Sequence, residues 1–377
     1  MIRRIIYISG TRADFGLMRS TLQLINASDC LELDLIVTGM HLLAKYGNTV
    51  EEIASSGLSI CAKVPVTLGG NDGSDMAIAL GQQIVGMTQA LLASKADIVL
   101  LLGDRGEMLA GAIAALHLNI PIVHIHGGEL SGTVDESIRH AISKLSHYHF
   151  TSTEESRHRL LKMGERPEKV FVTGAPGIDE ILSATMEGKA EIYREYGLEE
   201  NLPTALVLFH PVVQQAKDSE WQAGQLMDAV IQSGVQALVI MPNADAGGDA
   251  IRKVMRVYGK SASVVPLVHL PRLKYLSLLS AVDVMVGNSS SGIIEAASLK
   301  TAVVNVGDRQ SNRERNDSVI DVDYYQSSIY EAIKKALEMD CSAIVNRYGD
   351  GNAGQAITRH LTQICLDYKI LEKLNAY

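Results

Sequence analysis

Polar and charged residues follow directly after six short apolar segments of this sequence, where strands would end. Most of these segments are unbroken runs of Ile, Val and Leu, which are typical of strands buried on both faces of a parallel sheet. Such sheets bind ligands beyond the carboxyl ends of their strands, so we expect the polar residues to share one cleft. The loops that carry them are GTRAD (10–14), GDR (103–105), HGGE (126–129), HP (210–211), GNSSSG (287–292) and GDR (307–309).

Carboxylates and a histidine from this region are candidates for proton transfer. When several carboxylates lie close together in a desolvated cleft, the pKa values of some of them rise, which suits general acid–base catalysis. Asp135 belongs to this set if its helix begins at the cleft, although an acidic residue there could also only complement the helix dipole. The candidates are Asp104, Glu129, Asp135 and His210.

The segment GNSSSGIIEAAS (287–298) has the composition of a phosphate-binding loop followed by a helix. Free N–H groups at a helix start favour an anion, and three hydroxyl groups can donate to phosphate oxygens. Simple N-capping would explain the same residues, but one serine would cap as well as three, so a nucleotide phosphate is favoured. The predicted binding residues are Ser289, Ser290, Ser291, Gly292 and Glu295, the last of which could accept from two ribose hydroxyls.

Five arginines at or near these loops could bind the same ligand. Arg12 offers a bidentate fork to a phosphate, or else forms an ion pair with Asp14. Three arginines of the second half, Arg309, Arg313 and Arg315, could clamp the diphosphate or form a solvated basic loop, and the first two are the predicted binding residues. The remaining candidates for substrate binding are Arg105, Arg139, Arg309 and Arg313.

Seven of the 11 histidines lie within residues 117–158, where His124 and His126, and His147 and His149, form HxH pairs. Alternate residues of a strand share a face, so each pair could hold a metal ion. Core histidines that hydrogen-bond to the backbone would explain the same spacing, and this interpretation is favoured. We therefore expect no metal and no cofactor.

The loops must be positioned by strands that alternate with helices almost throughout the chain. This order predicts the α/β class, with doubly wound parallel sheets in two Rossmann-like halves and a cleft between them. Turn residues in GAPGID (174–179) predict a hinge near 174–176. The expected strands are 4–9, 33–38, 97–102, 121–125, 147–151, 170–173, 205–209, 237–241, 263–265, 282–286 and 301–304, and the expected helices of the first half are 15–25, 77–94, 107–116 and 135–146.

Length and charge exclude several classes of protein. A chain of 377 residues predicts two domains, at about 100–200 residues each. Lys and Arg total 34 against 43 Asp and Glu, and the net charge of −9 argues against a nucleic-acid partner. We find neither a signal-peptide core nor an apolar stretch of the about 18 residues that a membrane helix needs. We therefore expect a cytoplasmic protein that contacts no membrane.

The motifs, taken in order, resemble the UDP-N-acetylglucosamine 2-epimerases, and in particular the hydrolysing branch of bacterial sialic acid synthesis. The resemblance implies the two-domain GT-B fold, with an acid–base domain at 1–174, a UDP-binding domain at 175–354 and a last helix at 355–377 that packs back on the first domain. The matching segments are SGTRADFG (9–16), VTGMH (37–41), YGNT (46–49), LGDRGEML (102–109), HIHGGELSGTVDESIRHAISKLSHYHF (124–150), FHP (209–211), GNSSSGIIEA (287–296) and GDRQSNR (307–313).

The resemblance also implies a reaction that needs no redox cofactor. A base removes the C2 proton of UDP-N-acetylglucosamine and UDP leaves C1 by anti elimination. Water then adds to the 2-acetamidoglucal intermediate and releases N-acetylmannosamine. The positions that match the family's catalytic and UDP-binding residues are Asp104, Asp135, His210, Arg12, Ser290, Ser291 and Glu295.

One position departs from the family pattern. Many relatives have glutamate where this chain has His126, so either His126 takes over proton transfer, which its position favours, or Glu129 reaches in from the same loop. The substituents at C4 and C6 of the sugar stay open, because close relatives act on a UDP- or GDP-linked 2,4-diacetamido-trideoxy sugar of legionaminic acid synthesis. The sequence also leaves open a non-hydrolysing epimerase, a glycosyltransferase and a nucleotide-sugar sensor. The resemblance further implies a homodimer or homotetramer.

Overall fold

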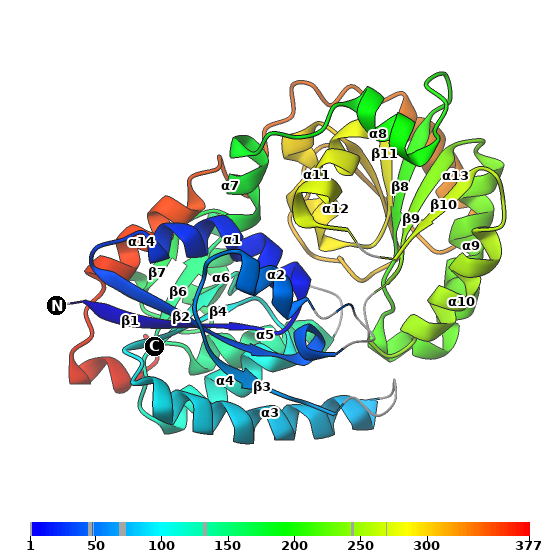
Figure 1. Cartoon of the computed structure of the whole chain (residues 1–377). Coiled ribbons are helices and arrows are strands. Elements are labelled where there is room, and N and C mark those ends of the chain that lie inside the picture. The colour runs from blue at the N-terminus through cyan, green and yellow to red at the C-terminus, as the bar shows by residue number, and fades with distance from the viewer. Residues whose placement is uncertain are drawn as a thin grey trace.

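The computed structural model describes residues 2–43, 47, 49–67, 73–130, 134–242, 245–268 and 270–377, and the statements below concern these residues. They form two β-sheets with helices packed around them (Figure 1). The first sheet has the strand order β3-β2-β1-β4-β5-β6-β7 and the second the order β10-β9-β8-β11-β12-β13. The predicted α/β architecture of two Rossmann-like domains is confirmed.

Each sheet pairs its strands in parallel, so the carboxyl ends of the strands meet along one edge. The strands of the first sheet are β1 (Arg3–Ser9), β2 (Leu31–Thr38), β3 (Ile60–Val64), β4 (Ile98–Leu102), β5 (Ile122–Ile125), β6 (Tyr148–Thr151) and β7 (Val170–Val172). Those of the second sheet are β8 (Thr204–Leu208), β9 (Gln236–Ile240), β10 (Val264–Leu267), β11 (Val284–Gly287), β12 (Ala302–Val306) and β13 (Val319–Val322).

Helices connect the strands and cover the sheets. The helices of the first sheet's region are α1 (Arg12–Asn26), α2 (Val50–Ser55), α3 (Gly73–Ser94), α4 (Gly106–His117), α5 (Val134–Leu145) and α6 (Glu154–Lys162). The others are α7 (Pro176–Ser183), α8 (Lys189–Tyr196), α9 (Ser219–Gln232), α10 (Gly248–Tyr258), α11 (Arg272–Ala281), α12 (Ser290–Ile294), α13 (Gln326–Leu337) and α14 (Ala353–Gln363).

Successive side chains of a strand point to opposite faces of the sheet, so a strand covered on both faces must be apolar throughout. In β1, Ile5 and Tyr7 belong to a core that includes side chains of α1 and α14. Ile6 and Ile8 belong to a second core with side chains of α3 and α4. The second sheet likewise separates two cores. This burial on both faces explains why the strands were recognisable as unbroken apolar runs.

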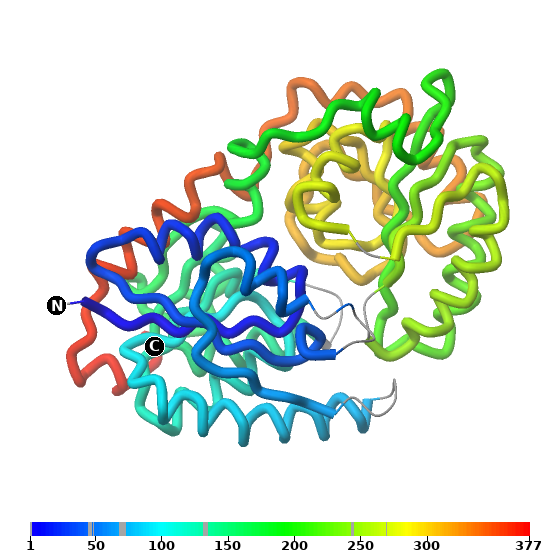
Figure 2. The backbone as a smooth tube through the Cα atoms, in the orientation of Figure 1, coloured from blue at the N-terminus to red at the C-terminus, as the bar shows by residue number. Residues whose placement is uncertain are grey.

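The chain returns to the first sheet at its C-terminal end. Helix α14 packs against α1 and α7, and Figure 2 shows this segment, in red, beside the blue and green tube of the first domain. Asp179 of α7 caps α14, because its carboxylate accepts from the N–H groups of Ala353 (3.0 Å) and Gly354 (2.5 Å). Further along, Lys373 Nζ lies 2.8 Å from a carboxylate oxygen of Glu165. The boundaries at 174 and 354 stay a prediction.

Two strands, β3 and β13, were not predicted from the sequence. Each lies at the edge of its sheet, where only one side of the strand is paired. Their sequences, ICAKV and VIDV, carry charged residues and are mostly exposed or half-buried. An edge strand does not need an unbroken apolar run, so the signal that identified the central strands is missing here.

Helix α3 is longer and more apolar than the sequence pattern predicted. Its 22 residues contain an 18-residue window with a mean hydropathy of 1.3, so by length and composition alone it could cross a membrane. The expectation that no apolar stretch reaches this length is therefore wrong. Length and composition are weak grounds for a membrane span, because core helices of globular proteins meet the same criteria. Helix α3 packs against α4 and β3, although only 22% of its apolar window is buried.

Candidate active site

A cavity of about 850 Å³, a size typical of small-molecule sites, is lined by both domains. The first domain contributes residues at the start of α1, and the second contributes the carboxyl ends of β8 and β9 and the start of α12. Six residues predicted from the sequence line it: Arg12, His210, Ser289, Ser290, Ser291 and Glu295. Three of the six predicted loops therefore line one cavity, whereas GDR (103–105), HGGE (126–129) and GDR (307–309) contribute none of its described lining residues.

The serine loop combines the two interpretations that the sequence allowed. Ser289 is the N-cap of α12, and its hydroxyl accepts from the N–H of Ser291 at 3.4 Å. The helix begins at Ser290 rather than near Gly292, and Ser290 and Ser291 line the cavity. Gly292 is buried, and a Cβ there would lie 2.9 Å from the side chain of Val303, so it lets α12 approach β12. The phosphate contacts of these residues stay a prediction.

Glu295 is held by partners that the sequence did not indicate. Ser291 Oγ and Arg272 Nη2 both donate to its carboxylate. Tyr275 in turn donates to Ser291 Oγ at 2.5 Å. Arg272 also donates to the carbonyl of Gly177 at 3.0 Å, which ties this wall of the cavity to α7 between the domains. Arg272 was missed because it lies 23 positions before Glu295, and no local pattern links the two.

Glu295→Ala should weaken UDP binding about 10- to 150-fold, because losing a charged hydrogen-bond acceptor costs roughly 1.5–3 kcal/mol. Isothermal titration calorimetry with UDP measures this. Glu180→Gln is the matched control, because Glu180 contacts Arg272 at 3.5 Å but is not among the described residues that line the cavity. Glu180→Gln should bind UDP as the wild type does. Unchanged UDP affinity in Glu295→Ala would remove the proposed ribose contact.

Arg12 enters the cavity from the start of α1, and its described ion pair is with Glu52 of α2, at 2.7 Å. Asp14, the other partner considered for Arg12, has a different task. Its carboxylate accepts from the N–H groups of Gly10 (3.0 Å) and Thr11 (2.6 Å), so it caps its own helix. Arg12 therefore lines the cavity at the start of α1 and is paired with Glu52 rather than with Asp14.

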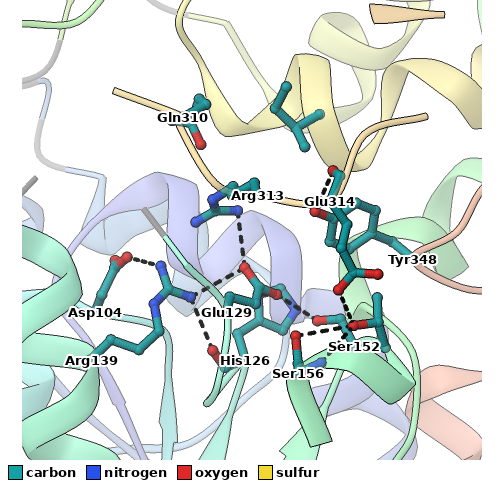
Figure 3. Close-up of polar contacts among 12 residues, drawn as sticks. Asp104, His126, Glu129, Arg139, Ser152, Ser156, Gln310, Arg313, Glu314 and Tyr348 are labelled. Atoms are coloured by element: carbon teal, nitrogen blue, oxygen red, sulfur yellow. Dashed lines mark hydrogen bonds and ion pairs between the residues drawn. The ribbon is translucent and has the colours of Figure 1, made fainter. Parts of the chain in front are cut away.

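A second group of polar residues lies where β4 and β5 end (Figure 3). Arg139 of α5 is 1% exposed, and its guanidinium donates to Asp104, to Glu129 at 3.2 Å and to the carbonyl of His126 at 3.0 Å. Ser152 donates to the other oxygen of Glu129 at 2.6 Å. His126 adopts a left-handed backbone conformation with φ of 65°, and its Nδ1 lies 3.5 Å from Glu129. One buried arginine therefore holds three of the predicted catalytic residues together.

The pKa values in this cluster move in the direction opposite to the one expected. Burial alone would raise the pKa of Glu129, but His126, Arg313 and Arg139 outweigh it and lower the pKa to about 2. The pKa of Asp104 is likewise lowered, because Arg139, Arg313 and Arg309 outweigh burial. The expectation that crowding raises these values is wrong for both carboxylates, since the arginines supply more positive charge than the neighbouring carboxylates offset. Both are ionised at neutral pH, as a base must be.

His210 comes from the end of β8, facing Arg105 of the first domain. Burial lowers the pKa of His210 to about 3, assisted by Arg309 and Arg105, so its imidazole is neutral. Arg105 Nη2 lies 3.7 Å from Asp245 and its Nε donates to Glu107 at 3.2 Å. These contacts bring the two domains together beside His210.

Asn288 is a positioning residue that the sequence pattern did not reveal. It is fully buried, and its side chain accepts from the N–H of His210 at 2.7 Å and donates to the carbonyl of His210 at 2.8 Å. Its own carbonyl accepts from Arg309 at 3.1 Å and from Gln310 at 3.0 Å. The asparagine inside GNSSSG was the available signal, but its partners come from other loops.

Asp135 is the second residue of α5. Despite burial, the pKa of Arg139 is raised by Asp104, Glu129 and Asp135, which places Asp135 within electrostatic reach of the same arginine. Residues 131–133 before it lie outside the described part of the chain, as do residues 46 and 48 of YGNT. The catalytic role of Asp135 stays a prediction.

The clustered histidines have hydrogen-bond partners of the kind that core histidines require. His124 contacts the carbonyl of Gly103 at 2.7 Å and Ser143 Oγ at 3.1 Å. His147 Nδ1 accepts from the N–H of Ile122 at 3.0 Å, and His149 contacts Glu165 at 3.0 Å. Within the described residues no group of three His, Cys, Asp or Glu side chains is arranged to hold a metal ion, and the expected absence of a metal stays a prediction.

Comparisons with known proteins agree on one family. The family model described as UDP-N-acetylglucosamine 2-epimerase matches residues 23–362. The UDP-N,N'-diacetylbacillosamine 2-epimerase (hydrolyzing) of Legionella pneumophila is 48% identical over 377 residues, which is all of both chains. The UDP-N-acetylglucosamine 2-epimerase of Neisseria meningitidis is 38% identical over 339 residues, covering 90% of this chain and 88% of that one.

The fold has solved counterparts. The UDP-GlcNAc 2-epimerase of Methanocaldococcus jannaschii, in complex with UDP-GlcNAc and UDP, superposes with a TM-score of 0.81 at 18% identity, over 95% of this chain and 99% of that one. At this identity the likeness shows the fold, which is the GT-B type expected from the sequence. The family-model match and the two sequence relatives show that this chain belongs to the UDP-N-acetylglucosamine 2-epimerase family.

Proposed function

We propose that this protein is a hydrolysing 2-epimerase that acts on UDP-N,N'-diacetylbacillosamine, releasing UDP and the free 2-epimeric sugar. The observation that carries the proposal is 48% identity over the whole chain to the Legionella enzyme of that name. The sequence motifs had favoured UDP-N-acetylglucosamine and kept the 2,4-diacetamido sugar as a second candidate. The greater likeness over the full length supports the diacetamido sugar as the first candidate.

The proposed reaction begins with loss of the C2 proton. Asp104 is the proposed base, because it follows β4 at the cleft, is ionised and is partly exposed at 22%, whereas Glu129 is 2% exposed. Asp135 and His210 are the other proposed proton carriers. His126 Nε2 is buried and has no hydrogen-bond partner among the described residues, so it is available for a proton, while Glu129 lies behind it at Nδ1. This arrangement favours His126 over Glu129 as the group that replaces the family's glutamate.

Departure of UDP requires positive charge and N–H donors around the diphosphate. Arg12, Ser289, Ser290 and Ser291 line the cavity and are the proposed contacts, with Glu295 on the ribose. Gly292, Arg105, Arg139, Arg309 and Arg313 were also predicted to bind substrate. Arg139, which is 1% exposed, instead pairs with Asp104 and Glu129. We retain Arg309, whose charge acts on both Asp104 and His210, as a further proposed contact of the diphosphate. Water then adds to C1 and a proton to C2 of the unsaturated intermediate, which gives the inverted configuration.

UDP-N-acetylglucosamine is the second candidate substrate, with the same reaction. It is favoured by the 38% identity to the Neisseria enzyme, which is named for that activity. Both sugars share the 2-acetamido group, the C2 proton and the UDP leaving group, so the same site residues serve either. They differ in their substituents at C4 and C6.

Proton NMR in deuterium oxide, run with each sugar nucleotide, tests the proposal. We expect UDP release without an acceptor, deuterium at C2 of the free product, and faster turnover of the diacetamido sugar. Retention of the C2 proton would contradict the elimination mechanism. A UDP-linked epimer as product would indicate a non-hydrolysing enzyme, and release only in the presence of an acceptor would indicate a glycosyltransferase. The homodimeric or homotetrameric state and the cytoplasmic location stay predictions.

A further inference from the structure

Two consecutive residues of the loop after β12 cross from the second domain to the first. Arg313 Nη1 lies 3.0 Å from Glu129 Oε2, and both side chains are buried, at 8% and 2% exposure. The next residue, Glu314, accepts from Thr153 Oγ1 at 2.5 Å and lies 3.8 Å from Arg159 Nη1. Figure 3 shows this loop reaching down to the cluster around Glu129.

Glu129 is the centre of these contacts rather than a group that faces the cleft. Its Oε2 faces Arg139 of its own domain and Arg313 of the other domain. Its Oε1 accepts a hydrogen bond from Ser152 and lies near His126 Nδ1. Because both oxygens of Glu129 have partners, Glu129 can orient the ring of His126 through Nδ1. The Nε2 atom of His126 can then contact a substrate. The second domain supplies the one member of this set that can leave when the domains separate.

We propose that Arg313 is a positioning residue: by holding Glu129 from across the cleft, it completes the proton-transfer cluster only when the two domains are closed. The proposal rests on the proposed function, because turnover is one of its readouts. It replaces the diphosphate contact that the sequence suggested for Arg313. Arg313 is not among the described residues that line the cavity of about 850 Å³, and neither are Asp104, His126 and Glu129, the cluster that Arg313 contacts.

The Arg313–Glu129 contact has an electrostatic consequence that a packing role would lack. The groups that face Glu129 are His126, Arg139 and Arg313, with Asp104 and Tyr348 nearby. Arg313 is one of two arginines, with Arg139, that hold the pKa of Glu129 low. Removing it raises that pKa. If ionised Glu129 orients His126, a variant without Arg313 should lose activity on acidification at a higher pH than the wild type does.

The test compares Arg313→Gln with Arg313→Lys and a control, Arg315→Gln. Arg315 comes from the same loop, but it pairs at 3.0 Å with Asp321 of its own domain, whose side chain is 52% exposed. For Arg313→Gln we expect kcat to fall about 100-fold, the loss typical of a misplaced catalytic group. UDP affinity should stay within about twofold of the wild type, and the acid limb of the pH–rate profile should move to higher pH. Arg313→Lys should return the acid limb towards its wild-type position, and Arg315→Gln should change neither quantity.

Two results would overturn the assignment. A loss of UDP affinity in Arg313→Gln that matches the loss of turnover would make Arg313 a phosphate ligand, and unchanged kcat with an unchanged acid limb would leave it without a role in catalysis. If the wild-type enzyme releases UDP from neither sugar nucleotide, the proposed function fails and the contact is still tested by stability. The effects of Arg313→Gln and Glu129→Gln on unfolding by urea should be non-additive, and additive effects would refute the contact itself.

Discussion

Asp104→Asn should reduce turnover by about 10²- to 10⁴-fold, the range that a positioned acid or base contributes, while UDP still binds. The amide has the shape of the carboxylate and can still accept a hydrogen bond from Arg139, so the cluster should remain assembled. It cannot take up the C2 proton. Release of UDP from the sugar nucleotide measures the turnover, and calorimetric titration with UDP measures binding.

Asp97→Asn is the matched control for this change. Asp97 lies just before the amino end of the same strand, β4, where its exposed carboxylate accepts from the N–H of Arg4 at 2.8 Å. It has the same residue type and lies on the same strand as Asp104, but at the edge of the sheet away from the cleft. Asp97→Asn should turn over substrate at the wild-type rate. Turnover in Asp104→Asn within a few-fold of the wild type would require another base, with Asp135 and His126 as the candidates.

Arg139→Met should destabilise the protein by about 3–5 kcal/mol, the cost typical of breaking a buried ion pair by removing one partner. Methionine fills much of the same volume, so little packing is lost. Asp104 and Glu129, however, would keep their charges without the cation that bridges them. Urea denaturation at pH 7 measures the loss. Arg347→Gln is the control, because the pair of Arg347 with Asp317 is exposed at 57% and 81% and should contribute no more than about 1 kcal/mol.

The destabilisation in Arg139→Met should also depend on pH. In the wild type the pKa of Glu129 is lowered from 4.5 to about 2, and that of Asp104 is lowered as well. Lowered carboxylate pKa values add stability that is fully present above their ordinary values and is lost as the pH falls through the lowered ones. The difference between Arg139→Met and the wild type should therefore shrink as the pH falls below about 4. A difference that stays constant from pH 7 to pH 3 would assign the loss to packing instead.

The parallel sheets were predictable because the burial of each central strand is visible in its own few residues. A strand such as β4, IVLLL, is buried along its whole length and must be apolar at every position. The polar residues that follow such strands had to meet at one edge, and six of them do line one cavity. The edge strands β3 and β13 escaped prediction because partial exposure removes the same signal.

The electrostatics of the site were not predictable, because they depend on distances between residues far apart in the sequence. Asp104 and Glu129 were expected to raise each other's pKa, yet Arg139 lies between them and lowers both. Arg272 holds Glu295, and Asn288 holds His210. Neither contact corresponds to a local spacing pattern in the sequence. Whether the pKa of a buried carboxylate rises or falls is therefore decided by which cations the fold brings beside it.

The sequence by itself determined which residue types stand at the ends of the strands, and hence that this chain holds candidate proton carriers in its first half and a candidate phosphate-binding loop in its second. Apolar runs and turn residues depend on a few neighbouring positions, so they can be read along the chain. Only the tertiary structure decided which of these residues meet: that Arg139 bridges Asp104 and Glu129, and that Arg313 reaches Glu129 from the other domain. Those contacts join segments that are far apart in the sequence, within the first domain for Arg139 and between the two domains for Arg313. Packing between distant segments produces no periodic pattern in the sequence.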